Sequence, residues 1–252
     1  MRCWRISPHR DDRLKPCVLS SFAVFFDHFR PGRSLVQPVH TQPFLDYTSI
    51  LVGLGIILIA LTVHEAAHAW TADRLGDPTA RLLGRVSLNP LVHIDPIGTI
   101  LLPLVAVLSN FPIIGWAKPV PVNLSRLRHP RRDFMIVAAA GPLSNLAQAV
   151  VATFLLHGLL GAGGAEGGAS PILELLFRAV QINVLLAFFN LIPIPPLDGG
   201  NVLAGLLPES AAMVLDRIRP FGFILLYALM FSGILWQLIL PPTRLFLRLL
   251  QL

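Results

Sequence analysis

The stretch SILVGLGIILIALTVHEAAHAW, residues Ser49–Trp70, decides the fold class. Its first two thirds are almost unbroken apolar residues, and its length matches the roughly 20 residues that a helix needs to cross the hydrocarbon core of a bilayer. Polar residues occur only in its last two turns, where Trp70 suits the membrane interface. The segment therefore predicts a transmembrane helix with two histidines and a glutamate near one end.

The composition of the whole chain agrees with a membrane protein. Of the 252 residues, 54% are hydrophobic and 13% are charged, whereas a soluble domain has about 25% charged residues. The net charge is +6, and the basic residues lie in loops between apolar runs, as in the cytoplasmic loops of membrane proteins. The chain lacks the interleaved aromatic and basic residues that single-stranded nucleic acids require. We therefore expect a lipid bilayer, and no nucleic acid, as partner.

Other apolar segments predict further membrane elements. Clear spans are predicted at residues 134–160, 171–192 and 221–240. Residues 97–114 contain Pro103 and Pro112, and basic residues on both sides favour a re-entrant hairpin slightly over a span. The loose alternation in Arg81–Leu88 is compatible with a short strand or ribbon. The prediction is an all-α polytopic membrane protein with about 4–5 transmembrane helices plus a re-entrant hairpin or short β-ribbon after the first span.

The pattern His64-Glu65-Ala66-Ala67-His68 is the strongest chemical signal in the chain. Two histidines four residues apart lie on one face of a helix, so both imidazoles can reach one ion. Zinc prefers such nitrogen ligands, and a catalytic zinc site uses three protein ligands and a water. Glu65 could accept a proton from that water. Because ionisable residues in a bilayer helix are costly, we interpret the pattern as a metal site rather than as a polar helix end.

A third ligand has to come from elsewhere in the chain. The candidates are Asp73, Asp77, His93, Asp95 and Asp198. The first two suit a loop and a turn, and the next two suit a helix cap or a local pair. Asp198 follows a proline-rich break and precedes two glycines, and irregular backbone at membrane depth is tolerated where it lines a cavity. The alternative for Asp198 is an N-cap of the helix that follows.

These residues together resemble the site-2 protease family of intramembrane zinc metalloproteases. The matching motifs are HEAAH at 64–68, GPLSN at 141–145, NLIP at 190–193 and LDGG at 197–200. The chain is similar to the compact members, which lack PDZ and cystathionine-synthase-like (CBS) modules. The resemblance implies one Zn²⁺ per chain held by His64, His68 and Asp198, with Glu65 as the catalytic base.

The resemblance also implies the partner and the location. The substrate would be a transmembrane protein, cut near the cytoplasmic side of the cell membrane. Asn145 and Asn190 are polar groups within apolar helices, and they could position the substrate backbone or stabilise a developing oxyanion. Each could equally form a helix–helix hydrogen bond, which contributes about 0.6 kcal/mol on average. The sequence leaves these two roles open.

The expected organisation has three parts. Residues 1–45 are interpreted as a poorly ordered basic arm, residues 46–243 as the intramembrane metalloprotease core, and residues 244–252 as a short tail. Two other functions deserve comparison with a protease. A secondary transporter would explain a proline-broken helix with an acidic residue, but it would not explain the histidine pair. A metal-binding protein without catalysis would not need Glu65.

Overall fold

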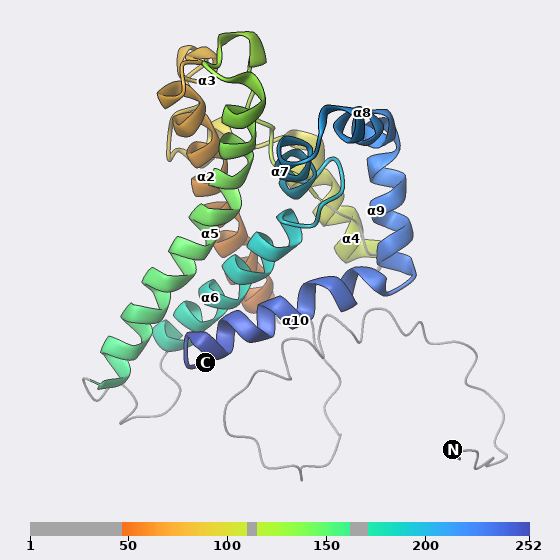
Figure 1. Cartoon of the computed structure of the whole chain (residues 1–252). Coiled ribbons are helices and arrows are strands. Elements are labelled where there is room, and N and C mark those ends of the chain that lie inside the picture. Colours follow the sequence, from red (N-terminus) through yellow and green to blue (C-terminus); the bar gives the residue numbers. More distant parts are fainter. Residues whose placement is uncertain (1–46, 110–114, 162–170) are drawn as a thin grey trace, which may run out of the picture. The chain divides into compact units, whose positions relative to one another are not determined.

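The computed structural model describes residues 47–109, 115–161 and 171–252 (Figure 1). The described residues fall into two compact units. The smaller unit comprises residues 96–109 with 115–116, and the larger one comprises residues 47–95, 117–161 and 171–252. The arm predicted at residues 1–45 lies outside the described residues.

Three long apolar helices form the framework of the larger unit: α2 (Tyr47–Arg74), α5 (Pro130–Gly161) and α6 (Pro171–Asn190). Each is long and apolar enough to cross a membrane. A helix satisfies its own backbone hydrogen bonds, which is a condition for spanning lipid. The three helices correspond to the first three clear spans predicted from the sequence, and the all-α polytopic membrane class is confirmed.

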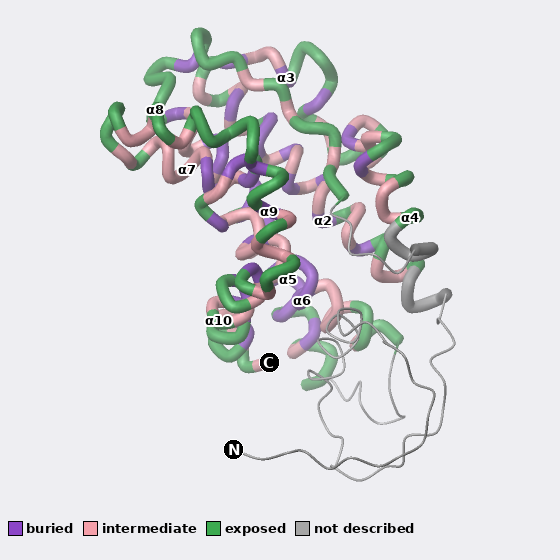
Figure 2. The backbone as a smooth tube through the Cα atoms, turned by 90° about the vertical axis from the view of Figure 1, so that its right-hand side faces the viewer, coloured by how far each residue is buried: buried purple, intermediate pink, exposed green. Residues whose placement is uncertain are grey.

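The helix α5 packs against both α2 and α6, and α2 also contacts α6. Fully buried alanines line these contacts, and Figure 2 marks the buried positions in purple; examples are Ala60, Ala69, Ala149 and Ala187. Small residues let helix backbones approach closely in lipid, where packing rather than hydrophobicity holds helices together. The close approach brings side chains of α2 and α6 within reach of the middle of α5.

The chain breaks after α6 and restarts as the short helix α7 (Asp198–Leu206). Pro193, Pro195 and Pro196 prevent the helix from continuing. Gly199 permits the tight return, because a Cβ atom at this position would lie 2.2 Å from the carbonyl oxygen of Leu191. The helix α7 then packs against α5, so the break holds Asp198 beside the three-helix framework.

The C-terminal part of the chain is helical: α8 (Glu209–Ile218), the short η4 (Arg219–Phe221), α9 (Gly222–Phe231) and α10 (Ile234–Leu249). The span predicted at residues 221–240 is not one straight helix but part of a bent pair of helices. Gly233 adopts a left-handed conformation with φ +77°, which ends one helix, and the segments before and after it are bent by 79°.

The final helix contacts α6. The rings of Phe188 and Phe246 lie 6.0 Å apart in an edge-to-face arrangement. The helix α10 continues to Leu249, so most of residues 244–252, predicted as a tail, belong to it. The described residues thus contain three clear spans, or four if the bent pair crosses as one unit.

The loop after α2 contains the short helix α3 (Thr79–Leu82) and the 3₁₀ turn η1 (Pro90–Val92). A second 3₁₀ turn, η3 (Leu124–Arg126), precedes α5. The ribbon predicted at Arg81–Leu88 is wrong, since no strand occurs in the part of the chain that the structure describes. The buried guanidinium of Arg85 donates instead to the carbonyls of Val92, Lys118 and Pro119. Side-chain to backbone bonds thus replace strand pairing.

The smaller unit begins with a π-helical turn, η2 (Pro96–Leu101), that runs into α4 (Leu102–Ser109). The backbone N–H of Trp116 donates to the carbonyl of Gly98 at 3.1 Å. Glycine is required there, because a Cβ atom would meet the Trp116 ring at 2.4 Å. Residues 110–114 lie outside the described residues, so the re-entrant hairpin at 97–114 stays a prediction.

Candidate metal centre

His64 and His68 lie one turn apart on α2 and face the interior of the larger unit. Only 3% of His64 and 8% of His68 are exposed. Their Nε2 atoms are 3.0 Å apart, and the rings meet edge to face. The four-residue spacing on a helix therefore brings both imidazoles to one point, as the sequence predicts.

Asp198, the first residue of α7, completes a cluster with the two histidines. Its Oδ2 atom lies 3.0 Å from Nε2 of His64 and 3.4 Å from Nε2 of His68. The alternative role of an N-cap is not observed, since Leu197 occupies the N-cap position and Asp198 is the first residue within α7. Across the described ranges this is the one group of three His, Cys, Asp or Glu side chains that could hold a metal ion.

The hydrogen bonds of the two imidazoles determine which nitrogens carry protons. Nδ1 of His68 lies 2.7 Å from the carbonyl oxygen of Val137 on α5. A carbonyl can only accept, so Nδ1–H of His68 donates. Nδ1 of His64 is 2.6 Å from Oδ1 of Asn145, which also accepts. Both Nε2 atoms therefore turn their lone pairs toward the carboxylate of Asp198.

Three electron-pair donors that face one another need a cation between them. A proton can be shared by only two of these atoms at a time. A four-coordinate metal ion can bind all three and keep its fourth coordination position open. Two imidazole nitrogens and one carboxylate match the ligand types and number of catalytic zinc sites, and their Nδ1–H groups have the buried acceptors that metal-bound histidines normally have. The donor set therefore fits a zinc ion.

The backbone of α5 forms one wall of the cluster at Gly141. A Cβ atom at this position would lie 2.4 Å from Nε2 of His68 and 2.5 Å from Nε2 of His64. Any larger residue would occupy the space in which the lone pairs meet. Glycine at this position thus leaves space beside both Nε2 atoms. The same helix still hydrogen-bonds to the Nδ1 atoms of both rings through Asn145 and Val137.

Glu65 follows His64 and projects about 100° further round α2. The residue is half-buried. Its carboxylate lies close enough to the His68 ring and to the Arg85 guanidinium to interact electrostatically with both. Glu65 therefore sits beside the ligand cluster and remains available for proton transfer.

The other sequence candidates for a third ligand lie outside the cluster. Asp73 pairs with Arg81, with 2.8 Å between Oδ1 and Nε. Nε2–H of His93 donates to the carbonyl of Ser87 at 2.8 Å. These two side chains hold the loop together.

Asp77 is fully buried, and its carboxylate is satisfied by neighbours in the loop. It accepts from the backbone N–H and hydroxyl of Thr79 and, at 2.6 Å, from the backbone N–H of Asn123. Burial alone would raise the pKa of Asp77, but these hydrogen bonds hold it below its usual value. Asp77 thus joins the loop after α2 to the segment before α5.

The two asparagines occupy different positions. Asn145 is completely buried behind His64, and its Nδ2 donates to the carboxamide oxygen of Asn183 at 2.9 Å. Asn190 is half-buried at the end of α6 and donates to the carbonyl of Leu186 at 3.0 Å. The surroundings of Asn145 favour the helix–helix hydrogen bond over contact with a substrate.

Sequence reasoning missed three contributors to the site. The carbonyl of Val137 has no sequence signature, because every residue carries one. The clearance at Gly141 depends on the approach of another helix. Asn183 could have been noticed, since a buried amide in a lipid-spanning helix needs partners and is costly without them.

The fold and the site together define a class: a polytopic membrane protein with a group of three side chains that could hold a metal ion. Comparison with known proteins agrees with this class. The sequence model of peptidase family M50 matches residues 157–233. The chain is 36% identical over 214 residues to "Putative zinc metalloprotease YwhC" of Bacillus subtilis (strain 168), covering 82% of this chain and 90% of that protein.

Mycobacterial proteins are also similar. The identity is 35% over 190 residues to "Putative zinc metalloprotease Rip2" of Mycolicibacterium smegmatis, covering 72% of this chain and 69% of that protein. A Mycobacterium tuberculosis (strain H37Rv) protein of the same name is 32% identical over 180 residues, which cover 68% and 63% of the two chains. No solved structure matches significantly. The chain belongs to peptidase family M50, the site-2 protease family.

Proposed function

We propose that this protein is an intramembrane zinc endopeptidase that hydrolyses peptide bonds in or near transmembrane segments of other membrane proteins. The observation that carries the proposal is the convergence of His64 Nε2, His68 Nε2 and Asp198 Oδ2 within 4.8 Å of one another. The two histidines lie on a helix long and apolar enough to span a bilayer. The relatives, which are named zinc metalloproteases, support the same chemistry.

The proposed ligands of one Zn²⁺ are His64, His68 and Asp198. An ion held by them supplies Lewis acidity, which polarises a scissile carbonyl and makes water more acidic. The protein contributes ligands that are oriented beforehand, since both imidazoles are fixed by hydrogen bonds on their far sides. Burial of the cluster limits access to water and strengthens its electrostatic interactions.

Glu65 is the proposed general base. A carboxylate next to a metal ligand can accept a proton from the attacking water and later donate it to the leaving amine. The half-buried position of Glu65 lets its oxygens exchange protons near the site. The guanidinium of Arg85 interacts electrostatically with Glu65, so a positive charge lies near the proposed base.

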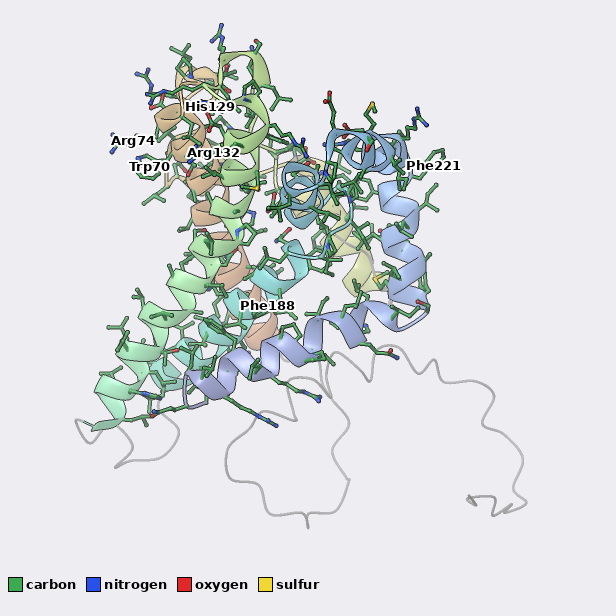
Figure 3. The ribbon with its side chains drawn as sticks, viewed as in Figure 1. Trp70, Arg74, His129, Arg132, Phe188 and Phe221 are labelled. Carbon is green, nitrogen blue, oxygen red and sulfur yellow. The ribbon has the colours of Figure 1, made fainter. Side chains whose placement is uncertain are left out.

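The catalytic centre is proposed to lie toward the cytoplasmic face. His68 is six residues before Arg74, the last residue of α2, which places it about 9 Å from that end. Trp70, Arg74, His129 and Arg132 lie at this same end of α2 and α5 (Figure 3). The guanidinium of Arg74 stacks over the Trp70 ring. Tryptophan is enriched at both membrane interfaces, and an excess of arginine and lysine marks the cytoplasmic one.

A helical substrate has to unwind before cleavage, because its carbonyls are engaged in helix hydrogen bonds. Residues 117–123 offer a place for the unwound chain. Pro119 and Pro121 favour extended backbone before each of them, and the N–H groups of Val120 and Val122 have no partner within the described ranges. The carbonyl of Pro119 faces Arg85, so the edge with the two valines is open for strand addition.

The decisive experiment uses purified protein in proteoliposomes with a single-span substrate, and compares wild type with Glu65→Gln. Wild type should cleave the substrate with zinc and stop when a chelator is added. Glu65→Gln should bind zinc normally but cleave roughly 10²–10⁴-fold more slowly, because the base is absent. Cleavage at the wild-type rate by Glu65→Gln would contradict the proposal.

The same experiment separates the alternatives. A secondary transporter would show solute flux and no cleavage. A metal-binding protein without catalysis would bind zinc but cleave nothing, and Glu65→Gln would change no measured property. Bound zinc is measured by elemental analysis of the same samples, so that loss of metal is not mistaken for loss of the base.

A further inference from the structure

A chain of amide groups runs from α6 through α5 to the back of His64. Nδ2 of Asn183 donates to the carbonyl of Ala179 at 2.9 Å, and Nδ2 of Asn145 donates to Oδ1 of Asn183 at 2.9 Å. Oδ1 of Asn145 lies 2.6 Å from Nδ1 of His64. Asn145 and Asn183 are 0% and 4% exposed, so water does not compete with this relay.

The direction of the relay is fixed at its far end. The carbonyl of Ala179 can only accept, so Asn183 must present its NH₂ group to it and its oxygen to Asn145. The carbonyl of Ala60 accepts from the same NH₂ group of Asn145 at 3.3 Å. Only the oxygen of Asn145 is then left for His64. The proton of a neutral His64 ring therefore has to be on Nδ1.

A backbone group of the same helix acts on the second imidazole. Val137 accepts from Nδ1–H of His68 at 2.7 Å, and Gly141 provides clearance for both Nε2 atoms. Val137, Gly141 and Asn145 follow one another at intervals of four residues. Positions at this spacing share one helix face. One face of α5 therefore contacts both imidazoles from behind and leaves room in front of them.

We propose that this face of α5, with Asn183 behind it, acts as a positioning device that holds both imidazoles in the Nδ1–H tautomer and thereby sets the affinity for zinc. The assignment rests on the proposed function, because it treats His64 and His68 as metal ligands. Asn145 is a positioning residue, since it would act on the ion only through His64. Asn183 orients Asn145 in turn.

The expected effect follows from what an unfixed imidazole does. Without an acceptor at Nδ1, His64 can rotate and place its proton on Nε2, and that form cannot bind the ion. Loss of such an outer partner typically lowers metal affinity by about 10–100-fold. The neighbouring histidine keeps its own acceptor, the carbonyl of Val137, so a change at Asn145 should affect His64 selectively.

The test compares Asn145→Leu, Asn145→Asp and Asn183→Leu with wild type in the full-length protein. Zinc affinity is measured by competition with a chromophoric chelator. Asn145→Leu should bind zinc about 10–100-fold more weakly. Asn145→Asp keeps an acceptor at the same place and, with its second oxygen protonated to donate to Oδ1 of Asn183, should restore most of the affinity. Asn183→Leu should have a smaller effect, because Ala60 still orients the Asn145 amide.

The matched control is Gln148→Leu. Gln148 lies on the same helix and its amide also donates to the carbonyl of Ala60, at 3.5 Å, but it does not contact a histidine. Its loss should leave zinc affinity unchanged. Thermal unfolding of each metal-free variant shows whether the helices remain packed, so a folding defect is recognised independently.

A second readout does not depend on zinc. Metal-free protein labelled with ¹⁵N-histidine reports the tautomer of each ring, and His64→Ala identifies the signal of His64. Wild type should show His64 protonated at Nδ1, and Asn145→Leu should shift it toward Nε2. An unchanged tautomer together with wild-type zinc affinity in Asn145→Leu would overturn the proposal. Absence of zinc binding in wild type would instead overturn the proposed function, and the tautomer measurement would still decide the role of Asn145.

Discussion

The loop after α2 holds the fully buried carboxylate of Asp77, and the metal centre holds the partly buried carboxylate of Asp198, but the two have different partners. Asp77 in the loop accepts hydrogen bonds from three donors on Thr79 and Asn123. Asp198 in the centre faces the Nε2 atoms of two imidazoles whose Nδ1–H groups are already engaged. A carboxylate whose oxygens accept hydrogen bonds from protein N–H and O–H groups is structural, whereas one that faces the lone pairs of two imidazoles is suited to bind a cation.

Removal of one ligand should have the largest effect. His64→Ala or Asp198→Ala leaves two ligands, so bound zinc and substrate cleavage should both be lost. Asp77→Ala is the matched control, because it removes a buried carboxylate whose hydrogen bonds come from Thr79 and Asn123; it should retain one zinc per chain. Elemental analysis of the purified proteins measures the difference. Normal zinc content in Asp198→Ala would contradict the view that Asp198 binds metal whereas Asp77 is structural.

The second largest effect is expected when a methyl group is added at Gly141. Gly141→Ala places Cβ where it would collide with both Nε2 atoms, so we expect most of the zinc to be lost although the helix itself is not weakened. Gly158→Ala on the same helix is the control, since a Cβ atom there meets nothing within 4 Å. Chelator competition on both variants gives the result. Equal zinc affinities would show that the clearance at Gly141 is unimportant.

A smaller effect is expected at the proposed substrate edge. Val120→Pro and Val122→Pro each remove one N–H that could pair with an unwound substrate. We expect slower cleavage of a helical substrate, with the zinc content unchanged. Pro119→Ala leaves both valine N–H groups in place and serves as the control. No loss of cleavage in the two proline variants would argue against strand addition at this segment.

The smallest effect concerns stability alone. The lowered pKa of Asp77 means that the folded state binds its proton less tightly than the unfolded state. The ionised carboxylate therefore stabilises the fold above the unfolded pKa of about 3.9, and this contribution is lost as the pH falls through the lower folded value. Asp77→Ala should lower stability at neutral pH by about 1–3 kcal/mol, as measured by thermal unfolding. At strongly acidic pH, wild type and variant should converge.

The sequence predicts most of the centre because its signals are local. Two histidines at a four-residue spacing need only a helix to meet, and the structure supplies one. Asp198 is different, because its position depends on how the proline-rich break returns the chain to α5. The resemblance to a family supplied that ligand, whereas spacing alone left several acidic candidates open.

The remaining features depend on contacts that no local pattern encodes. The hydrogen bond from Nδ1–H of His68 to the Val137 carbonyl forms only because α2 and α5 pack closely together. The bend at Gly233 follows from a left-handed conformation that a glycine allows but does not require. The predicted ribbon at Arg81–Leu88 failed because Arg85 binds backbone carbonyls of two distant segments, which an alternating pattern does not reveal.

The origin of the ligands on α2 and α7 has a consequence for biogenesis. His64 and His68 are synthesised and inserted early, whereas Asp198 emerges only after two further membrane-spanning helices. Under the proposed function, a nascent chain that carries the histidines alone has an incomplete set of zinc ligands and cannot yet hydrolyse peptide bonds. The proposed activity would then begin only after α7 has been synthesised and packed against α5.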